Sequence, residues 1–209
     1  EFVAASEIGE RLALAEALAG AHACALVYVY IPELDVIGHA HGWESDRWAA
    51  QLETLDGELR RWDHQLASGI GAVLTADHGM IDVPAHRHVL LRDDDELLDE
   101  VELVAGEPRM LHLYTAEGSV ERVASRWRES ESGRSWVMTR DEAVEARLFG
   151  AVDPAVVPRI GDVLVAARSG VAYYDDRLAD KKPQRMIGQH GSLTDQERIV
   201  PLVRFGAFA

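Results

Sequence analysis

Two apolar, β-rich runs on either side of an amphipathic stretch constrain the fold more than any other feature of the sequence. The first run covers residues 24–31 and ends at Pro32, and the second covers residues 71–76. Between them, apolar residues recur every three or four positions, which predicts a helix with Ser45 as its N-cap. These apolar residues are Trp48, Leu52, Leu55, Leu59, Trp62 and Leu66. Strand, helix and strand in this order predict a βαβ unit with parallel strands, and hence an α/β core.

The rest of the chain adds smaller elements to this core. Residues 6–19 have helical spacing, with Gly20 as the stop. Strands are predicted over 110–114, 135–139, 161–167 and 171–174, and helices over 120–130 and 141–149. The strands over 161–167 and 171–174 look paired, and a last run over 199–203 contains Pro201, which indicates an edge position. We therefore expect a mainly parallel central sheet flanked by helices from residues 1–84 and 161–209, and a small α+β insertion or cap over 85–160.

Composition and charge exclude several classes of protein. The chain has 209 residues, 47% of them hydrophobic and 27% charged, which is typical of a globular protein that can bury a core. Its net charge of −15 argues against a nucleic-acid polymer as partner, because such proteins gather Lys and Arg. No apolar run reaches the roughly 18 to 20 residues that a membrane span needs. The single cysteine, Cys24, excludes an internal disulfide and favours a reducing, cytoplasmic location, although residue 1 is not Met and a targeting signal upstream stays open.

Polar side chains follow both predicted strands and recur near the C-terminus. Asp35 and His39 come after the first run, Asp77 and His78 come after the second, and His190 stands between glycines before the last run. In open α/β sheets, ligands bind beyond the carboxyl ends of the parallel strands, so these side chains are expected on one rim. Carboxylate oxygen and imidazole nitrogen suit zinc and related divalent ions. The alternative is that each pair is a hydrogen-bonded loop pair without metal.

The backbone around the first pair is predicted to be a loop. A spacing of four residues would align Asp35 and His39 on one face of a helix, but Pro32 and Gly38 favour a tightly bent loop there. Gly79 permits the turn that would let Asp77 and its neighbour converge after the second strand.

Three motifs, in this order and spacing, resemble one known family. They are YIPELDVIGHAHGWES at residues 30–45, TADHGM at 75–80, and GQHGS at 188–192 ahead of an Ile-Val-Pro-Leu-Val run. Together with RIGDVLV at 159–165, they make the chain from Ala25 onward resemble the C-terminal two-thirds of a type I phosphodiesterase/nucleotide pyrophosphatase of the alkaline phosphatase superfamily. The resemblance implies an alkaline-phosphatase-like α/β fold and a small phosphodiester or nucleotide substrate.

The resemblance also implies which residues would carry the chemistry. Asp35, His39 and His190 would hold one divalent ion, zinc by preference, while Asp77 and His78 would belong to a second. In such enzymes a Thr or Ser hydroxylate, activated by the second metal, attacks phosphorus and forms a covalent phospho-enzyme, which water activated by the first metal releases. Two ions about 4 Å apart clamp the attacking and leaving oxygens.

The chain departs from the family pattern in two places. Trp43 stands where the family usually has Pro, and nothing in residues 1–24 resembles the segment that supplies the nucleophile and the last acidic ligand. Thr75 is a poor substitute nucleophile, because a β-branched residue in a strand needs no further explanation. We therefore expect no catalytic residue in this chain, partial metal occupancy, and a fragment that is inactive alone and self-associates through exposed apolar surface.

Other readings stay open at this point. The chain could be a non-catalytic metal-binding domain, or the superfamily activity could be that of a phosphomonoesterase, sulfatase or phosphomutase. Leaving-group specificity would lie in the insertion and upstream of the chain, so the sequence does not name the substrate. His41 is expected to be a loop or substrate-side residue. Three further histidines have no motif support and are expected to be exposed or locally bonded: His86, His88 and His112.

Overall fold

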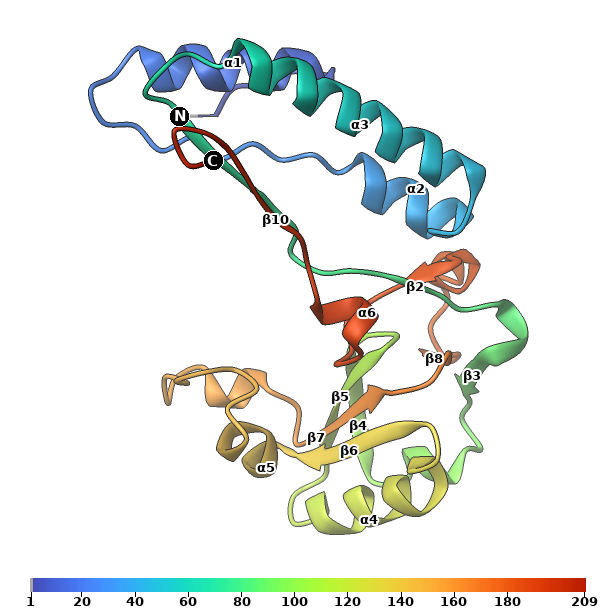
Figure 1. The fold of residues 1–209 in the computed structure, drawn as a ribbon. Coiled ribbons are helices and arrows are strands. Elements are labelled where there is room, and N and C mark those ends of the chain that lie inside the picture. Colours follow the sequence, from blue (N-terminus) through green and yellow to red (C-terminus); the bar gives the residue numbers. More distant parts are fainter. Residues whose placement is uncertain (1) are drawn as a thin grey trace. The chain divides into compact units, whose positions relative to one another are not determined.

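The computed structural model describes residues 2–209, which form two compact units (Figure 1). Unit 1 consists of residues 2–77 and 200–209, and unit 2 of residues 78–199. None of the helices in the described part of the chain is long and apolar enough to cross a membrane.

Unit 1 is built from three helices and a two-stranded ribbon. The helices are α1 (Ile8–Gly20), α2 (Glu33–His41) and α3 (Asp46–Gln65), and β1 (Gly71–Thr75) pairs with β10 (Leu202–Gly206) in antiparallel fashion. The core of the unit lies where α1 meets α3. Its buried members are Ile8, Leu12, Leu55 and Leu59, with Leu74 and Phe205 of the ribbon packed against them.

Local signals predicted the two long helices of unit 1 correctly. The Ser45 hydroxyl accepts a hydrogen bond from the backbone nitrogen of Trp48 at 3.2 Å, so Ser45 caps α3 as expected. Helix α1 ends at Gly20, the predicted stop. The apolar stripe of α3 buries Leu55 and Leu59 against α1, which is the packing that a 3.6-residue period produces.

The predicted strand over residues 24–31 is wrong. The segment has no regular structure and is mostly exposed, with Leu26 at 99% and Tyr28 at 84% exposure. An apolar run becomes a strand only where a neighbouring strand accepts its backbone hydrogen bonds, and none of the described strands pairs with it. The expected parallel βαβ unit is therefore absent from the described residues, and β1 pairs with β10 instead.

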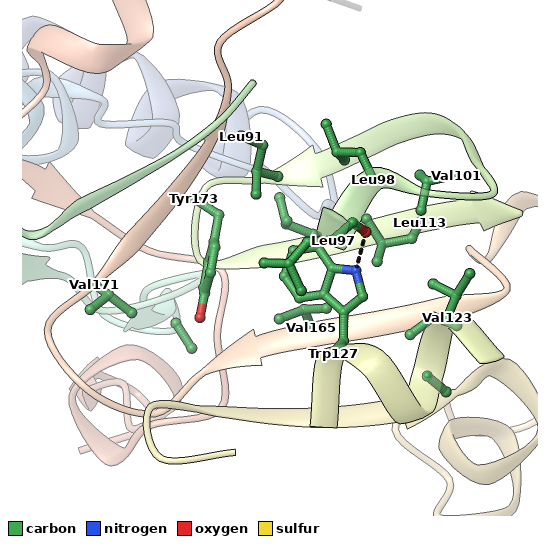
Figure 2. Packing of buried hydrophobic residues seen from close by; sticks show 14 residues of the cluster. Leu91, Leu97, Leu98, Val101, Leu113, Val123, Trp127, Val165, Val171 and Tyr173 are labelled. Carbon is green, nitrogen blue, oxygen red and sulfur yellow. Dashed lines mark hydrogen bonds between the residues drawn. The ribbon is translucent and has the colours of Figure 1, made fainter. Parts of the chain in front are cut away.

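Unit 2 contains a four-stranded antiparallel sheet with the order β4-β5-β7-β6. Its strands are β4 (Val101–Glu107), β5 (Met110–Thr115), β7 (Val163–Ala167) and β6 (Ser135–Thr139). Every residue of the central strand β7 is buried. Helix α4 (Val120–Glu131) packs against the sheet, and Figure 2 shows its Trp127 within the apolar cluster. The Trp127 indole donates a hydrogen bond to the Leu97 carbonyl at 2.8 Å, so its one polar atom is satisfied.

Smaller elements complete unit 2. Strand β3 (His88–Leu91) pairs in parallel with β8 (Ala172–Asp175), and β2 (Ile81–Asp82) pairs in antiparallel fashion with β9 (Gly188–Gln189). The short helices are α5 (Arg140–Glu145), α6 (Asp195–Arg198), η1 (Ala85–Arg87), η2 (Glu96–Leu98), η3 (Val157–Arg159) and η4 (Lys182–Arg185).

Two local predictions in unit 2 need correction. Strands β7 and β8 are not paired with each other, because β5 and β6 occupy both sides of β7 and β8 pairs with β3. The guanidinium of Arg109 binds the carbonyls of Ala167, Ser169 and Val171 where β7 leads to β8. Helix α5 stops at Glu145 rather than at residue 149. Arg147 has a φ of 57°, the left-handed conformation that ends a helix.

The mixture of helices and sheets agrees with the predicted α/β class, while the β3–β8 pair is the one parallel pairing among the described strands. Strand β7 comes from outside residues 85–160 yet lies in the sheet of β4, β5 and β6. The division into a core of residues 1–84 and 161–209 and an insertion over 85–160 stays a prediction.

Candidate functional site

Asp35 and His39 lie one turn apart on helix α2, so the predicted loop at this place is wrong. Pro32 is the N-cap residue, a position where its missing N–H costs nothing, and Gly38 is buried within the helix. The Trp48 indole donates a hydrogen bond to the Leu34 carbonyl at 3.1 Å and so ties α2 to α3. Tertiary packing thus outweighs the weak helix propensity of glycine.

The carboxylate of Asp35 has the properties of a cation ligand. His39 Nε2 lies 3.4 Å from Asp35 Oδ1, across one helical turn. Oδ1 itself is buried and accepts no hydrogen bond from any described residue. A buried carboxylate oxygen without a hydrogen bond is unfavourable, and a bound cation would remove that penalty. The oxygen of Asp35 and the nitrogen of His39 therefore fit a divalent ion.

In unit 2, the structure brings His78 and His190 together. Their imidazole rings stack with centroids 3.6 Å apart and planes inclined by 15°. One ring nitrogen of each residue lies within 4.8 Å of the other. His190 directly follows β9, which pairs with β2 just after His78, so this short ladder holds the two segments side by side. The arrangement places two imidazoles close enough together for one nitrogen of each to contact a common ion.

The hydrogen bond at one ring nitrogen of His78 bears on its tautomer. Nδ1 of His78 lies 2.9 Å from the carbonyl oxygen of Gly79, which can only accept. Nδ1 therefore carries the proton in the neutral ring, and Nε2 carries the lone pair that a metal ion would use.

The glycines that follow both histidines are required by close contacts. A Cβ on Gly79 would lie 2.0 Å from the carbonyl oxygen of Gln196. Gly191 has a φ of 116°, and a Cβ there would lie 2.9 Å from the Cβ of Glu107. Only glycine allows both chain segments to pass so close to their neighbours.

Comparison with known proteins assigns the chain to a family. A family model described as type I phosphodiesterase/nucleotide pyrophosphatase matches residues 4–193. The chain belongs to this family. The sequence resemblance is thus confirmed, and no curated protein matches the chain in a sequence search.

Solved structures confirm the fold of this family member. Murine and human ectonucleotide pyrophosphatase/phosphodiesterase 5 each superpose with a TM-score of 0.74, at 18% and 16% identity, and the matches cover 99% of this chain and 54% of those chains. Phosphonoacetate hydrolase from Sinorhizobium meliloti, in complex with phosphonoacetate, has a TM-score of 0.59 at 22% identity, over 81% of this chain and 43% of that one. These likenesses show the alkaline-phosphatase-like α/β fold, and the chain spans about half the length of the solved relatives.

The ligand sets that the resemblance implies stay a prediction. Within single units, the structure pairs Asp35 with His39 and His78 with His190, whereas the resemblance groups His190 with the first pair. Asp77 lies on an exposed bend immediately before His78, after β1 has ended at Thr75. The chain therefore turns at Asp77, as the sequence suggested.

Sequence reasoning missed two buried charged residues near the histidines of unit 2. The side chains of Arg109 and Glu197 are 0% and 1% exposed and form an ion pair with a nitrogen-to-oxygen distance of 2.6 Å. Glu197 belongs to the stretch DQER, whose composition is typical of an exposed helix, and Arg109 sits in a turn between two strands. No local pattern distinguishes them from surface charges, since their burial depends on contacts with distant segments.

Proposed function

We propose that this chain is the metal-binding part of a hydrolase that cleaves phosphodiester or nucleotide pyrophosphate bonds. Membership of the type I phosphodiesterase/nucleotide pyrophosphatase family supports the reaction class. The observation that carries the metal dependence is the stacking of His78 on His190, two histidines from distant parts of the sequence that each follow a strand and precede a required glycine. Imidazole nitrogens are common ligands of divalent ions such as zinc, and one nitrogen of each ring lies within 4.8 Å of the other.

Each ligand has a role in this proposal. Asp35, His39 and His190 hold one ion, and Asp77 and His78 belong to a second. The shielded Asp35 Oδ1, which accepts no hydrogen bond from the described residues, and its neighbour His39 supply an oxygen and a nitrogen from one face of α2. The Gly79 carbonyl orients the ring of His78.

The donor set favours zinc, because two carboxylates and three imidazoles match its usual ligands. When bound, a pair of such ions supplies Lewis-acid chemistry at a phosphoryl group. It also supplies local positive charge on a protein whose net charge is −15. An anionic phosphodiester can therefore bind despite the overall sign.

We propose a small phosphodiester or nucleotide as the substrate. The solved murine relative, as an inactive variant, is in complex with AMP, which makes a nucleotide the first candidate to test. No residue of this chain is assigned as nucleophile, because Thr75 is a β-branched residue at the end of strand β1, a position that strand propensity alone explains. The chain alone is accordingly expected to bind zinc without hydrolysing substrate.

Isothermal titration with zinc tests the metal site on the 209-residue chain. Wild type should bind, and His78→Ala and His190→Ala should each weaken binding by at least about tenfold, because each removes one direct ligand. His64→Ala, at an exposed position on α3, is the matched control and should bind as wild type does. Zinc affinity that is equal in all four proteins would refute the site.

Hydrolysis of bis-p-nitrophenyl phosphate by the complete gene product, with and without a chelator, tests the reaction. The proposal expects diester turnover that the chelator abolishes. Faster turnover of the monoester p-nitrophenyl phosphate would identify a phosphomonoesterase instead. Zinc binding without any turnover would identify a non-catalytic metal-binding domain.

A further inference from the structure

We propose that the buried ion pair of Arg109 and Glu197 is a positioning element that holds the His78 and His190 rings in register. The expected effect of the ion pair on metal affinity rests on the proposed function. The claim that the ion pair positions the two rings rests only on contacts within unit 2.

Arg109 lies in the turn between β4 and β5, and its side chain is held by a full set of hydrogen bonds. Its Nε and Nη2 bind the two carboxylate oxygens of Glu197 at 3.0 and 2.6 Å, the paired geometry that suits a guanidinium. Its remaining donors reach backbone carbonyls at the end of β7 and in the turn that leads to β8. These acceptors are Ser169 at 2.5 Å, Val171 at 2.7 Å and Ala167 at 3.2 Å. All five N–H groups are therefore used, and the orientation of the side chain is fixed.

The Glu197 carboxylate, which Arg109 holds in place, also binds the segment that carries His190. Oε1 accepts a hydrogen bond from the backbone nitrogen of Ser192 at 3.0 Å, two residues beyond His190. Oε2 accepts another from the Thr194 hydroxyl at 2.5 Å. With the two bonds from Arg109, each oxygen of the carboxylate accepts two hydrogen bonds.

The backbone of Glu197 holds the segment that carries the other histidine. Its carbonyl oxygen accepts a hydrogen bond from the backbone nitrogen of Gly79 at 2.6 Å, one residue beyond His78. One residue thus binds both histidine segments, the first through its main chain and the second through its side chain. A shift of Glu197 would move Gly79 relative to Ser192, and hence one ring relative to the other.

A positioning role explains this pair better than a contribution to stability does. Burying two charges is costly, and buried ion pairs contribute little net stability compared with apolar residues of the same shape. What the pair provides is a defined orientation for the two loops. Supporting contacts of this kind are known to set the geometry and the affinity of metal ligands.

Unit 2 offers a matched control carboxylate. Glu131 is 1% exposed and accepts hydrogen bonds from Tyr173 at 2.5 Å and from Arg134 at 2.6 Å. Arg134 donates a second hydrogen bond at 2.8 Å and Ser130 donates one at 2.9 Å, so Glu131 accepts four hydrogen bonds, as Glu197 does. The partners of Glu131 lie at the end of α4, just before β6 and on β8, not in the histidine segments. Glu131→Gln therefore removes a buried carboxylate of similar burial and bonding without touching the loops in question.

The test compares Glu197→Gln with Glu131→Gln by NMR on the histidine-labelled 209-residue chain without metal. The inter-ring nuclear Overhauser effect between His78 and His190 and their ring-current shifts report the stacking directly. His78→Asn and His190→Asn assign the signals. We expect Glu197→Gln to weaken the effect and move both sets of shifts, and Glu131→Gln to leave them unchanged. Unchanged signals in Glu197→Gln, or equal losses in both variants, would overturn the proposal.

A second variant keeps the test decisive if Glu197→Gln does not fold. The double variant Arg109→Met with Glu197→Leu replaces the ion pair by apolar side chains of similar length, a change that buried pairs tolerate. It retains the carbonyl bond to Gly79 but loses the bonds to Ser192 and Thr194. It should fold and still lose the inter-ring signal. A folded double variant with wild-type stacking would refute the positioning role.

Zinc titration separates this proposal from the proposed function. If both hold, Glu197→Gln weakens zinc binding by about 10- to 100-fold and Glu131→Gln does not change it. If wild type binds no zinc, the proposed function fails, while the NMR comparison still decides the positioning role.

Discussion

The backbone nitrogen of Gly79 donates a hydrogen bond to the carbonyl oxygen of Glu197 at 2.6 Å, with no room for a side chain between the two segments. The contact joins the residue after His78 to helix α6. It also explains why a glycine follows the histidine, since any Cβ at position 79 would overlap the Gln196 carbonyl at 2.0 Å. The spacing of the two segments is therefore set by a residue that has no side chain.

Gly79→Ala should push these segments apart. We expect it to lower the free energy of unfolding by about 1 to 3 kcal/mol, the usual effect of overpacking, and to weaken zinc binding as well. Gly133→Ala is the matched control, because a Cβ there would meet nothing within 4 Å. Urea unfolding and zinc titration of both variants check the prediction. Wild-type behaviour of Gly79→Ala would contradict it.

Trp127 is expected to be the most sensitive core position of unit 2. It is fully buried, and its indole nitrogen is bonded to the Leu97 carbonyl (Figure 2). Trp127→Ala should cost about 3 to 5 kcal/mol through the cavity it leaves. Trp127→Phe should cost about 1 to 3 kcal/mol, because it leaves a buried carbonyl unpaired. Trp136→Phe, at a partly exposed strand position, is the control and should stay within about 0.5 kcal/mol. Hydrogen exchange of the β5 and β7 amides measures the loss within unit 2.

Acidification should destabilise unit 2 through His112. Its Nδ1 accepts a hydrogen bond from the Gly161 backbone nitrogen at 3.1 Å, and burial lowers its pKa below the ordinary value of 6.5. The unfolded chain therefore binds a proton before the folded chain does. The contribution of His112 to the free energy of unfolding is fully present above about pH 6.5 and is lost as the pH falls from there towards the lowered pKa of the folded state.

His112→Asn tests this source of pH dependence. The Asn oxygen can accept the same hydrogen bond but does not titrate, so urea unfolding at about pH 7.5 and about pH 5.5 should differ less than in wild type. His88, whose pKa is also lowered by burial, supplies part of the remaining slope. The control His64→Asn, on the exposed surface of α3, should keep the wild-type slope. An unchanged slope in His112→Asn would count against the prediction.

Glu131 should contribute to stability above about pH 4.5 and lose this contribution in acid. Burial by itself raises the pKa of this carboxyl, but hydrogen bonds from Arg134, Tyr173 and Ser130 outweigh burial and lower it below 4.5. Because the folded pKa is depressed, the contribution is present above about pH 4.5 and is lost as the pH falls through the folded pKa. Glu131→Gln should lower stability at neutral pH by about 1 to 3 kcal/mol and flatten the acid limb of the stability profile. Circular dichroism during an acid titration measures both effects, and an acid limb as steep as in wild type would exclude Glu131 as its source.

The elements that could be predicted from sequence are those whose signals are local. Helix α3 has its cap in Ser45 and its apolar period in its own residues, and α4, β5 and β6 likewise follow their predicted ranges. Residues 24–31 could not be predicted, because an apolar run becomes a strand only with a partner strand. Helix α2 was missed because its packing on α3, through the bond from Trp48 to Leu34, outweighs Gly38.

The candidate site likewise contains residues that the sequence predicts and residues that it does not. The apolar run over 71–76 pointed to His78 and the glycine-flanked motif ahead of the last run pointed to His190, and the structure stacks the two rings. The ion pair that binds both histidine segments has no sequence signal, because Arg109 and Glu197 lie 88 positions apart in the chain. Side chains that bind substrate or metal follow recognisable motifs, whereas the groups that support them are selected by distant packing.

The mutual dependence of Arg109 and Glu197 also limits how this protein can evolve. Replacing either one alone leaves an uncompensated charge at a fully buried position, which is strongly destabilising. Single substitutions at the two positions should therefore be absent among close homologues. Joint replacement by an apolar pair would keep the fold but give up the orientation of the two histidine segments, so aligned homologues should retain both residues together.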